Sequence, residues 1–138
     1  LPGVILPEEV LATISMEDVC SDKDILVFAV PSIFVRSTAK EAAPYIKKRQ
    51  HVVNEAKGNE DDSLKQLSQI MREELPQAQI AVLSGPSHAE EVGRRIPTTL
   101  VAGASDEEAA KRVQDIFMSD VLRVYTSPDV TGIELGGA

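Results

Sequence analysis

The sequence predicts a doubly wound α/β fold, in which helices flank a mainly parallel sheet. Short apolar runs alternate with amphipathic stretches along the chain, which is the pattern of strands followed by helices. The first three apolar runs begin near residues 25, 52 and 80, and a separation of about 27 residues fits one strand–helix–strand crossover. Both observations favour parallel neighbouring strands joined by helices.

Five segments have the composition of strands. The first, Asp24–Pro31, holds six consecutive apolar residues, which is typical of a strand buried on both faces. The last, Leu122–Tyr125, includes the polar Arg123, so we expect it near an edge of the sheet, where an antiparallel direction is open to it. The others are predicted over His51–Ala56, Gln79–Leu83 and Thr98–Ala102, with Leu11–Ile14 as a further short candidate.

Helices are predicted between these strands. Ser32–Ala43 and Ser63–Leu75 each stop before a proline, where helices usually end. Glu107–Met118 follows a capping box formed by Ser105 and Glu108. The residues expected on the inward faces are Leu64, Leu67, Ile70 and Met71 on the second helix, and Val113, Ile116 and Phe117 on the third.

The end of the chain carries the start of another helix. Asp129 is a candidate N-cap, and Val130, Ile133 and Leu135 follow at nearly helical spacing. No C-cap closes the pattern before Ala138. We interpret the chain as a piece of a longer protein.

Composition narrows the functional classes. The chain has 138 residues, enough for one domain with an apolar core. The net charge of −8 disfavours nucleic acids and anionic membranes as partners. The longest apolar run, Ile25–Val30, is too short to span a bilayer and no secretory signal is visible, so we expect a cytoplasmic protein. Cys20 is expected as a small buried group, and the two histidines lack metal-ligand spacing.

Ligands in open α/β sheets bind at the carboxyl ends of strands, beside helix N-termini. Lys57 follows an apolar run directly. It is either a solvated lysine, which position alone favours, or a cation directed at a carbonyl or phosphate group. Gly58 permits a sharp turn beside a ligand. Because the net charge is negative, a phosphorylated ligand needs a local positive group.

The loop after the third apolar run offers further candidates. Gly85 has no side chain to obstruct a ligand. Ser87 and Glu90 have the spacing of a capping box, which explains both residues structurally but leaves the nearby N–H groups available to an anion. His88 is expected at the surface, and Phe34 is either core packing or a lid over a planar ring. The sequence contains no G-x-G-x-x-G or G-x-x-x-x-G-K-[ST] turn for phosphates.

Several strings occur together in order. The most specific is Leu83-Ser-Gly-Pro-Ser-His-Ala-Glu-Glu-Val92. The others are Leu1-Pro-Gly-Val4, Ala29-Val-Pro-Ser32 with Arg36, Val53-Asn-Glu-Ala-Lys-Gly58, Ile96-Pro-Thr98 and Gly132-Ile-Glu-Leu-Gly-Gly-Ala138. Taken together, the chain closely resembles part of the bacterial-type NAD(P)-dependent glycerol-3-phosphate dehydrogenases.

The resemblance implies a partial Rossmann-like cofactor domain over residues 1–128. It implies that residues 129–138 start the helix leading to an absent all-helical substrate domain. The first βα unit, with its glycine-rich turn, would precede Leu1, and the proton-transferring lysine would follow Ala138. Two residues depart from the usual family pattern, Ile33 after Pro-Ser and Asn59 after Lys-Gly.

The resemblance also implies a reaction, in which hydride passes between NAD(P)H and glycerone phosphate to give sn-glycerol 3-phosphate for phospholipid synthesis. The full-length enzyme is expected to be a homodimer. By position, Lys57 resembles a residue that contacts both cofactor and substrate. Gly85 and Ser87 resemble substrate contacts, and Ala89 and Phe34 resemble cofactor contacts. No metal is implied.

Two other functions remain open at this stage. A two-domain dehydrogenase of the 3-hydroxy acid type would act on a carboxylate substrate, with no phosphate bound by the Gly85–Ser87 loop. A non-catalytic receiver-like module would need acidic residues clustered at the strand ends. Asp22 and Asp24 instead precede the first strand, which disfavours the module.

Overall fold

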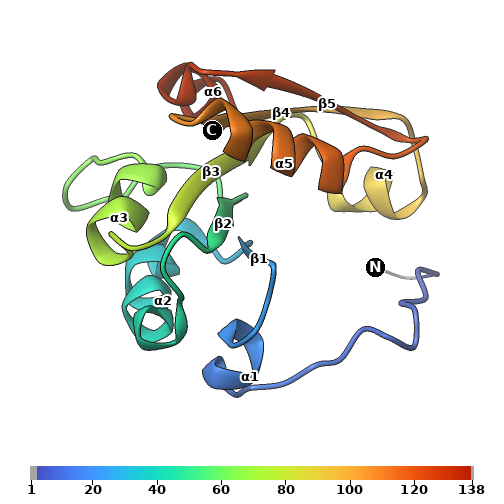
Figure 1. The fold of residues 1–138 in the computed structure, drawn as a ribbon. Coiled ribbons are helices and arrows are strands. Elements are labelled where there is room, and N and C mark those ends of the chain that lie inside the picture. Colours follow the sequence, from blue (N-terminus) through green and yellow to red (C-terminus); the bar gives the residue numbers. More distant parts are fainter. Residues whose placement is uncertain (1–2, 138) are drawn as a thin grey trace.

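The computed structural model describes residues 3–137 and places five strands in one sheet (Figure 1). Leu1, Pro2 and Ala138, which belong to the first and last of the strings above, lie outside the described residues. The strands follow one another in space as in the sequence, in the order β1-β2-β3-β4-β5. They are β1 (Ile25–Phe28), β2 (His51–Asn54), β3 (Gln79–Ser84), β4 (Thr98–Ala104) and β5 (Leu122–Ser127). All five predicted strands are confirmed.

The strand direction changes between β3 and β4. β1, β2 and β3 are parallel neighbours, β4 is antiparallel to β3, and β5 is parallel to β4. The sheet is therefore mainly parallel and β5 lies at an edge, as predicted. The sequence left an antiparallel direction open for the last strand, but β5 is parallel to its neighbour β4. The antiparallel pair is β3 and β4. The β3–β4 connection holds only the five-residue α4 (Ala89–Gly93), which is too short for the helical crossover that a parallel pair needs.

Helices cover both faces of the sheet (Figure 1). The other helical segments are α1 (Met16–Cys20), the 3₁₀ turns η1 (Ser32–Phe34) and η2 (Ala43–Tyr45), α2 (Val35–Ala42), α3 (Leu67–Glu74), α5 (Glu107–Phe117) and α6 (Val130–Gly136). Val52 and Ile80 share a buried cluster with α1, α2 and α3, whereas Val53 and Leu83 share the opposite one with α5. Successive residues of one strand pack into two different cores, and for this reason the sequence of each such strand is a continuous apolar run.

The segment before α3 differs from its prediction. The helix begins at Leu67 rather than Ser63, and its N-cap is Gln66, which forms a reciprocal capping box with Gln69. Leu64 is 77% exposed with a φ of +57°, so it does not belong to the buried face. Residues 59–66 instead form a small hairpin, closed by an antiparallel bridge between Asn59 and Gln66. Apolar spacing alone did not reveal this turn.

Other local predictions are also corrected. Leu11–Ile14 is not a strand but part of an exposed segment without regular structure. The N-cap of α5 is Asp106, which accepts from the Glu108 N–H, so Ser105 is not the cap. Val113 is buried as expected, whereas Ile116 is largely exposed. The predicted cap of the last helix is confirmed, since the Asp129 carboxylate accepts from the Gly132 N–H at 2.9 Å.

Candidate functional site

The carboxyl ends of β2 and β3 bring Lys57 and Gly85 together. The two strands are parallel neighbours, so the loops that follow them leave the sheet at the same edge. Lys57 is exposed, and its Nζ donates a hydrogen bond of 3.0 Å to the Gly85 carbonyl oxygen. The structure therefore places two of the predicted site residues in direct contact, although they are 28 residues apart in the sequence.

Two glycines allow the backbone to approach closely at this edge. Gly58 has a φ of +101°, and a Cβ there would lie 3.6 Å from the Ser32 Oγ. Gly85 has a φ of +151°, and a Cβ there would lie only 2.7 Å from the Thr99 carbonyl oxygen. Both backbone conformations favour glycine. At Gly58 the loop after β2 thus lies beside the loop after β1. At Gly85 the loop after β3 lies against β4.

Ser87 also converges on the Gly85 carbonyl. Its N–H donates to that oxygen at 2.8 Å, and its hydroxyl lies 3.4 Å from the same atom. The predicted capping box is wrong, because the N-cap of α4 is His88 and no side chain caps the helix. The half-buried Ser87 hydroxyl is consequently held near Lys57 rather than at the start of a helix. His88 is exposed, as expected.

Phe34 and Ala89 lie at the same edge but outside this contact. Phe34 ends η1 and is 52% exposed, so of the two alternatives core packing is wrong, and the ring is accessible at the surface. Ala89 is the exposed first residue of α4. Within residues 3–137, neither residue forms a hydrogen bond with Lys57 or Gly85.

A small cavity of about 10 Å³ lies beneath Lys57, lined in part by Asn54, Ser84 and Glu134. Asn54 is buried; its Nδ2 donates to the Ala56 carbonyl oxygen at 3.0 Å, and its Oδ1 has no partner among the described residues. Buried polar atoms are normally hydrogen-bonded. The site therefore retains an acceptor for a donor, such as a water molecule or a group of a ligand.

Glu134 connects α6 to α3 beside the site. Its carboxylate accepts from the Ser68 N–H at 2.9 Å and from the Ser68 hydroxyl at 2.6 Å. Ser68 lies in the first turn of α3, where a negative charge is favourable. Sequence reasoning missed this pair because its members are 66 residues apart and neither has a spacing that signals a partner.

A cluster of charged residues beside the site was also missed. The Arg36 guanidinium on α2 donates to both carboxylate oxygens of Glu60, from Nε at 2.6 Å and from Nη2 at 2.9 Å. It also contacts two residues of α3, Glu73 at 3.1 Å and Glu74. The position of Arg36 in one of the strings was the only signal, and it did not indicate a partner.

The pKa of Glu60 gives a test of this ion pair. Hydrogen bonds from Arg36 and then Ser63 lower it from 4.5 to about 2. Because the folded-state pKa is lowered, the stabilising contribution of Glu60 is complete above pH 4.5 and is lost as the pH falls through about 2. We expect NMR titration of the side-chain carboxyl carbon to show this low midpoint, and Arg36→Met to move it towards 4.5. A wild-type midpoint at the ordinary value would contradict the ion pair.

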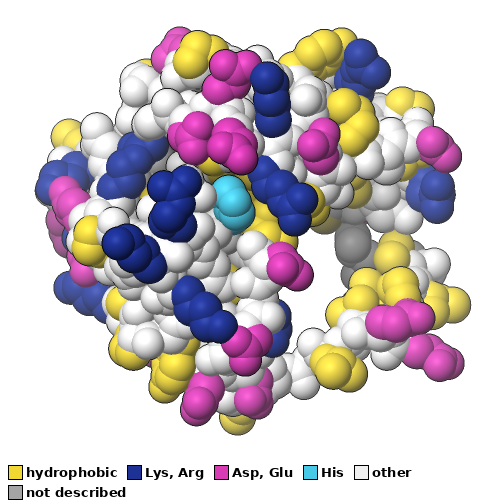
Figure 2. Space-filling model, in the orientation of Figure 1, with side chains coloured by type: hydrophobic (Ala, Val, Ile, Leu, Met, Phe, Trp, Pro, Cys, Tyr) yellow, Lys and Arg dark blue, Asp and Glu magenta, His cyan; other side chains and the backbone are white. Residues whose placement is uncertain are grey.

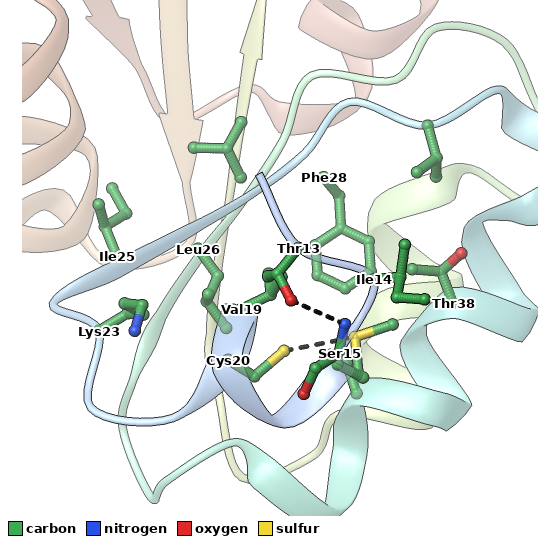
Figure 3. A pocket seen from close by; sticks show the side chains of 14 residues that line it. Thr13, Ile14, Ser15, Val19, Cys20, Lys23, Ile25, Leu26, Phe28 and Thr38 are labelled. Carbon is green, nitrogen blue, oxygen red and sulfur yellow. Dashed lines mark hydrogen bonds between the residues drawn. The ribbon is translucent and has the colours of Figure 1, made fainter. Parts of the chain in front are cut away.

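An apolar pocket of about 430 Å³ lies elsewhere, beside β1 and α1 (Figure 3). It contains Cys20, which is buried and lies 3.6 Å from the Met16 sulfur. Burial raises the pKa of the Cys20 thiol, outweighing the opposite effect of Lys23, so a reactive thiolate is disfavoured. The prediction of a small buried residue is confirmed.

The described residues hold neither a metal-binding cluster nor a helix able to span a membrane. Figure 2 shows Lys and Arg side chains interspersed with Asp and Glu, and hydrophobic side chains on the N-terminal segment, where Ile5 and Leu11 are exposed. Residues 3–137 hold no group of three or more His, Cys, Asp or Glu side chains that could bind a metal ion. In the same part of the chain, no helix has the length and apolar character needed to cross a membrane.

The layered sheet and the polar contacts at the ends of β2 and β3 define a Rossmann-like α/β domain. A family model described as NAD-dependent glycerol-3-phosphate dehydrogenase N-terminus matches residues 1–110, and the chain belongs to this family. The resemblance stated from the strings is therefore confirmed.

Relatives and solved structures agree with this assignment. Glycerol-3-phosphate dehydrogenase [NAD(P)+] of Agathobacter rectalis is 54% identical over the whole chain, which covers 41% of that protein. The Bacillus subtilis protein of the same name is 46% identical, with the same coverage. The chain thus spans about two fifths of the length of these curated relatives.

Two crystal structures share the fold. The Coxiella burnetii glycerol-3-phosphate dehydrogenase has a TM-score of 0.92 at 27% identity, over 99% of this chain and 42% of that one. The Saccharomyces cerevisiae enzyme has a TM-score of 0.86 at 26% identity, over 100% of this chain and 42% of that one. The predicted fold class is confirmed.

Proposed function

We propose that this chain is part of a cytoplasmic glycerol-3-phosphate dehydrogenase that transfers a hydride between NAD(P)H and glycerone phosphate. The product would be sn-glycerol 3-phosphate for glycerophospholipid synthesis. Residues 1–128 would form part of the cofactor domain, and residues 129–138 would begin the helix towards the substrate domain of a homodimeric enzyme. Family membership supports the proposal, and the contact between the Lys57 ammonium and the Gly85 carbonyl is the structural observation that carries it.

Lys57 would stabilise the charge that develops during the reaction. Reduction of a ketone places negative charge on its oxygen, and a preorganised cation lowers the energy of that transition state. The Lys57 Nζ already donates to one carbonyl oxygen, that of Gly85. A flexible lysine side chain can exchange this partner for a substrate oxygen. In a chain with net charge −8, such a local cation also favours binding of an anionic substrate.

Gly85 and Ser87 would complete the substrate side of the site. The absence of a side chain at Gly85 lets its backbone lie against β4, with its carbonyl oxygen 3.0 Å from the Lys57 ammonium. The Ser87 hydroxyl lies 3.4 Å from the Gly85 carbonyl, so a substrate oxygen in this place would meet a hydroxyl donor as well as an ammonium. Both residues would therefore bind and orient the substrate.

Phe34 and Ala89 would contact the cofactor. The nicotinamide ring supplies the hydride when the cofactor is bound. The half-exposed Phe34 ring offers a flat apolar surface to a planar ring. The small exposed side chain of Ala89 would leave space for another part of the cofactor. Proton transfer would belong to the lysine that the resemblance implies beyond Ala138.

The first test compares the chain with the complete enzyme. We expect the complete enzyme to oxidise NADH or NADPH in the presence of glycerone phosphate, and the isolated chain to give no turnover above the buffer rate. The measurement is loss of nicotinamide absorbance with each cofactor. Turnover by the isolated chain would contradict the division of residues proposed here. Activity of the complete enzyme with a 3-keto acid, and none with glycerone phosphate, would favour the 3-hydroxy acid alternative.

A further inference from the structure

The Arg36 guanidinium connects three elements around the lysine loop. The lysine loop is residues 57–66, from Lys57 to the N-cap of α3. Arg36 lies on α2, Glu60 lies within the lysine loop, and Glu73 and Glu74 lie on α3. Exposed ion pairs generally contribute little, but a bidentate arginine within a network is the geometry in which they do contribute. Here the bidentate contact is the one made to the loop.

The backbone of Glu60 is hydrogen-bonded within the loop, so holding its side chain also holds the loop backbone. Its N–H donates to the Lys65 carbonyl at 3.0 Å, and its own carbonyl accepts from the Leu64 N–H at 2.8 Å. The Asn59–Gln66 bridge closes the same hairpin at its base. Glu60 is three residues after Lys57, so fixing its side chain limits the positions that the Lys57 backbone can adopt.

The loop passes Ser32 at Gly58. Its Cα faces Ser32, and a Cβ at this position would lie 3.6 Å from the Ser32 Oγ. Ser32 begins η1, which leads directly into α2 and Arg36. Lys57 therefore leaves β2 close to the point at which the Arg36–Glu60 ion pair holds the loop. From this position the Lys57 ammonium contacts the Gly85 carbonyl oxygen.

We propose that the Arg36–Glu60 ion pair is a positioning device that holds the lysine loop so that the Lys57 ammonium points at the Gly85 edge. Arg36 is a positioning residue, since it acts through Lys57 and not on a ligand. This inference rests on the proposed function, in which Lys57 contacts the substrate. The contacts of Arg36 to Glu73 and Glu74 join α2 to α3. Glu73 also pairs with Lys65 of the lysine loop, whereas the Glu74 contact joins the two helices alone.

The matched variants are Glu60→Gln and Glu74→Gln in the complete enzyme. Both remove one carboxylate from the same guanidinium, but only Glu60 lies in the lysine loop. We expect Glu60→Gln to lower kcat/KM about tenfold to a hundredfold, the size typical of a misplaced catalytic group. Glu74→Gln should change it by less than about twofold, because the Glu74 ion pair with Arg36 joins α3 to α2 and not to the lysine loop. Equal effects of the two variants, or no effect of Glu60→Gln, would overturn the inference.

A double-mutant cycle with Lys57→Ala separates positioning from general support of the fold. If Arg36 and Glu60 act through Lys57, then Glu60→Gln should cost less than about twofold once Lys57 is absent, because coupled residues are not additive. The same loss in both backgrounds would show a structural role and overturn the inference. If Lys57→Ala alone leaves the activity normal, the proposed role of Lys57 fails whatever Glu60→Gln does.

Hydrogen exchange provides a readout without substrate or cofactor. The Glu60 and Leu64 N–H groups are both hydrogen-bonded inside the hairpin, so their exchange reports local opening. We expect Arg36→Met and Glu60→Gln to speed this exchange about tenfold while exchange in the central strands is unchanged. Glu74→Gln should leave the loop amides as in the wild type. Unchanged exchange in Glu60→Gln would overturn the positioning role.

Discussion

Lys57→Ala is expected to lower kcat/KM of the complete enzyme for glycerone phosphate by about two to three orders of magnitude, the cost of removing a preorganised group that stabilises transition-state charge. The reason is local. Lys57 places its ammonium at the shared edge of β2 and β3, 3.0 Å from the Gly85 carbonyl oxygen. Steady-state kinetics with varied glycerone phosphate would measure the loss, and a fall in kcat would show that the interaction belongs to the transition state.

Two companion variants make this result specific. Lys40→Ala removes another exposed lysine, in the last turn of α2, and should leave kcat/KM near the wild-type value. Lys57→Arg retains the charge but replaces a compact ammonium by a planar guanidinium, so we expect it to recover only part of the activity. Near-normal kinetics of Lys57→Ala would remove this residue from the site and leave the Lys57–Gly85 contact as a purely structural hydrogen bond.

The sheet could be predicted from the sequence because its physical cause is local. Strands buried on two faces must be apolar throughout, and residues 25–30 and 79–83 show this directly. The direction of a strand cannot be predicted in this way, because an apolar run has the same composition in a parallel and in an antiparallel strand. The reversal at β4 depends instead on the short connection that contains α4.

The site was predictable only in part, for a related reason. Lys57 and Gly85 follow apolar runs, so the rule that ligands bind at strand ends identified them. The Arg36–Glu60 pair spans 24 residues and depends on the hairpin over residues 59–66. That hairpin includes Leu64 with a positive φ, which a sequence pattern read as helix does not predict. The N-cap of α4 is His88 and not the predicted Ser87, so the Ser87 hydroxyl lies near the Gly85 carbonyl instead.

Gly85→Ala is expected to destabilise the chain by about 3 kcal/mol, since backbone strain and overpacking each cost about 1–3 kcal/mol. The φ of +151° disfavours a side chain, and the added Cβ would lie 2.7 Å from the Thr99 carbonyl oxygen and 3.1 Å from a Leu100 methyl carbon. The first of these neighbours is backbone within β4, so it cannot rotate away. Urea unfolding followed by circular dichroism would measure the difference.

Gly136→Ala is the matched control for this substitution. It adds the same methyl group at the end of α6, where nothing lies within 4 Å of the new Cβ. Alanine is the better helix former, so the free energy of unfolding should stay equal or rise slightly. If Gly85→Ala unfolds at the same urea concentration as Gly136→Ala, then the backbone at Gly85 tolerates a side chain. In that case the close approach of β3 to β4 would not be what fixes the carbonyl that Lys57 contacts.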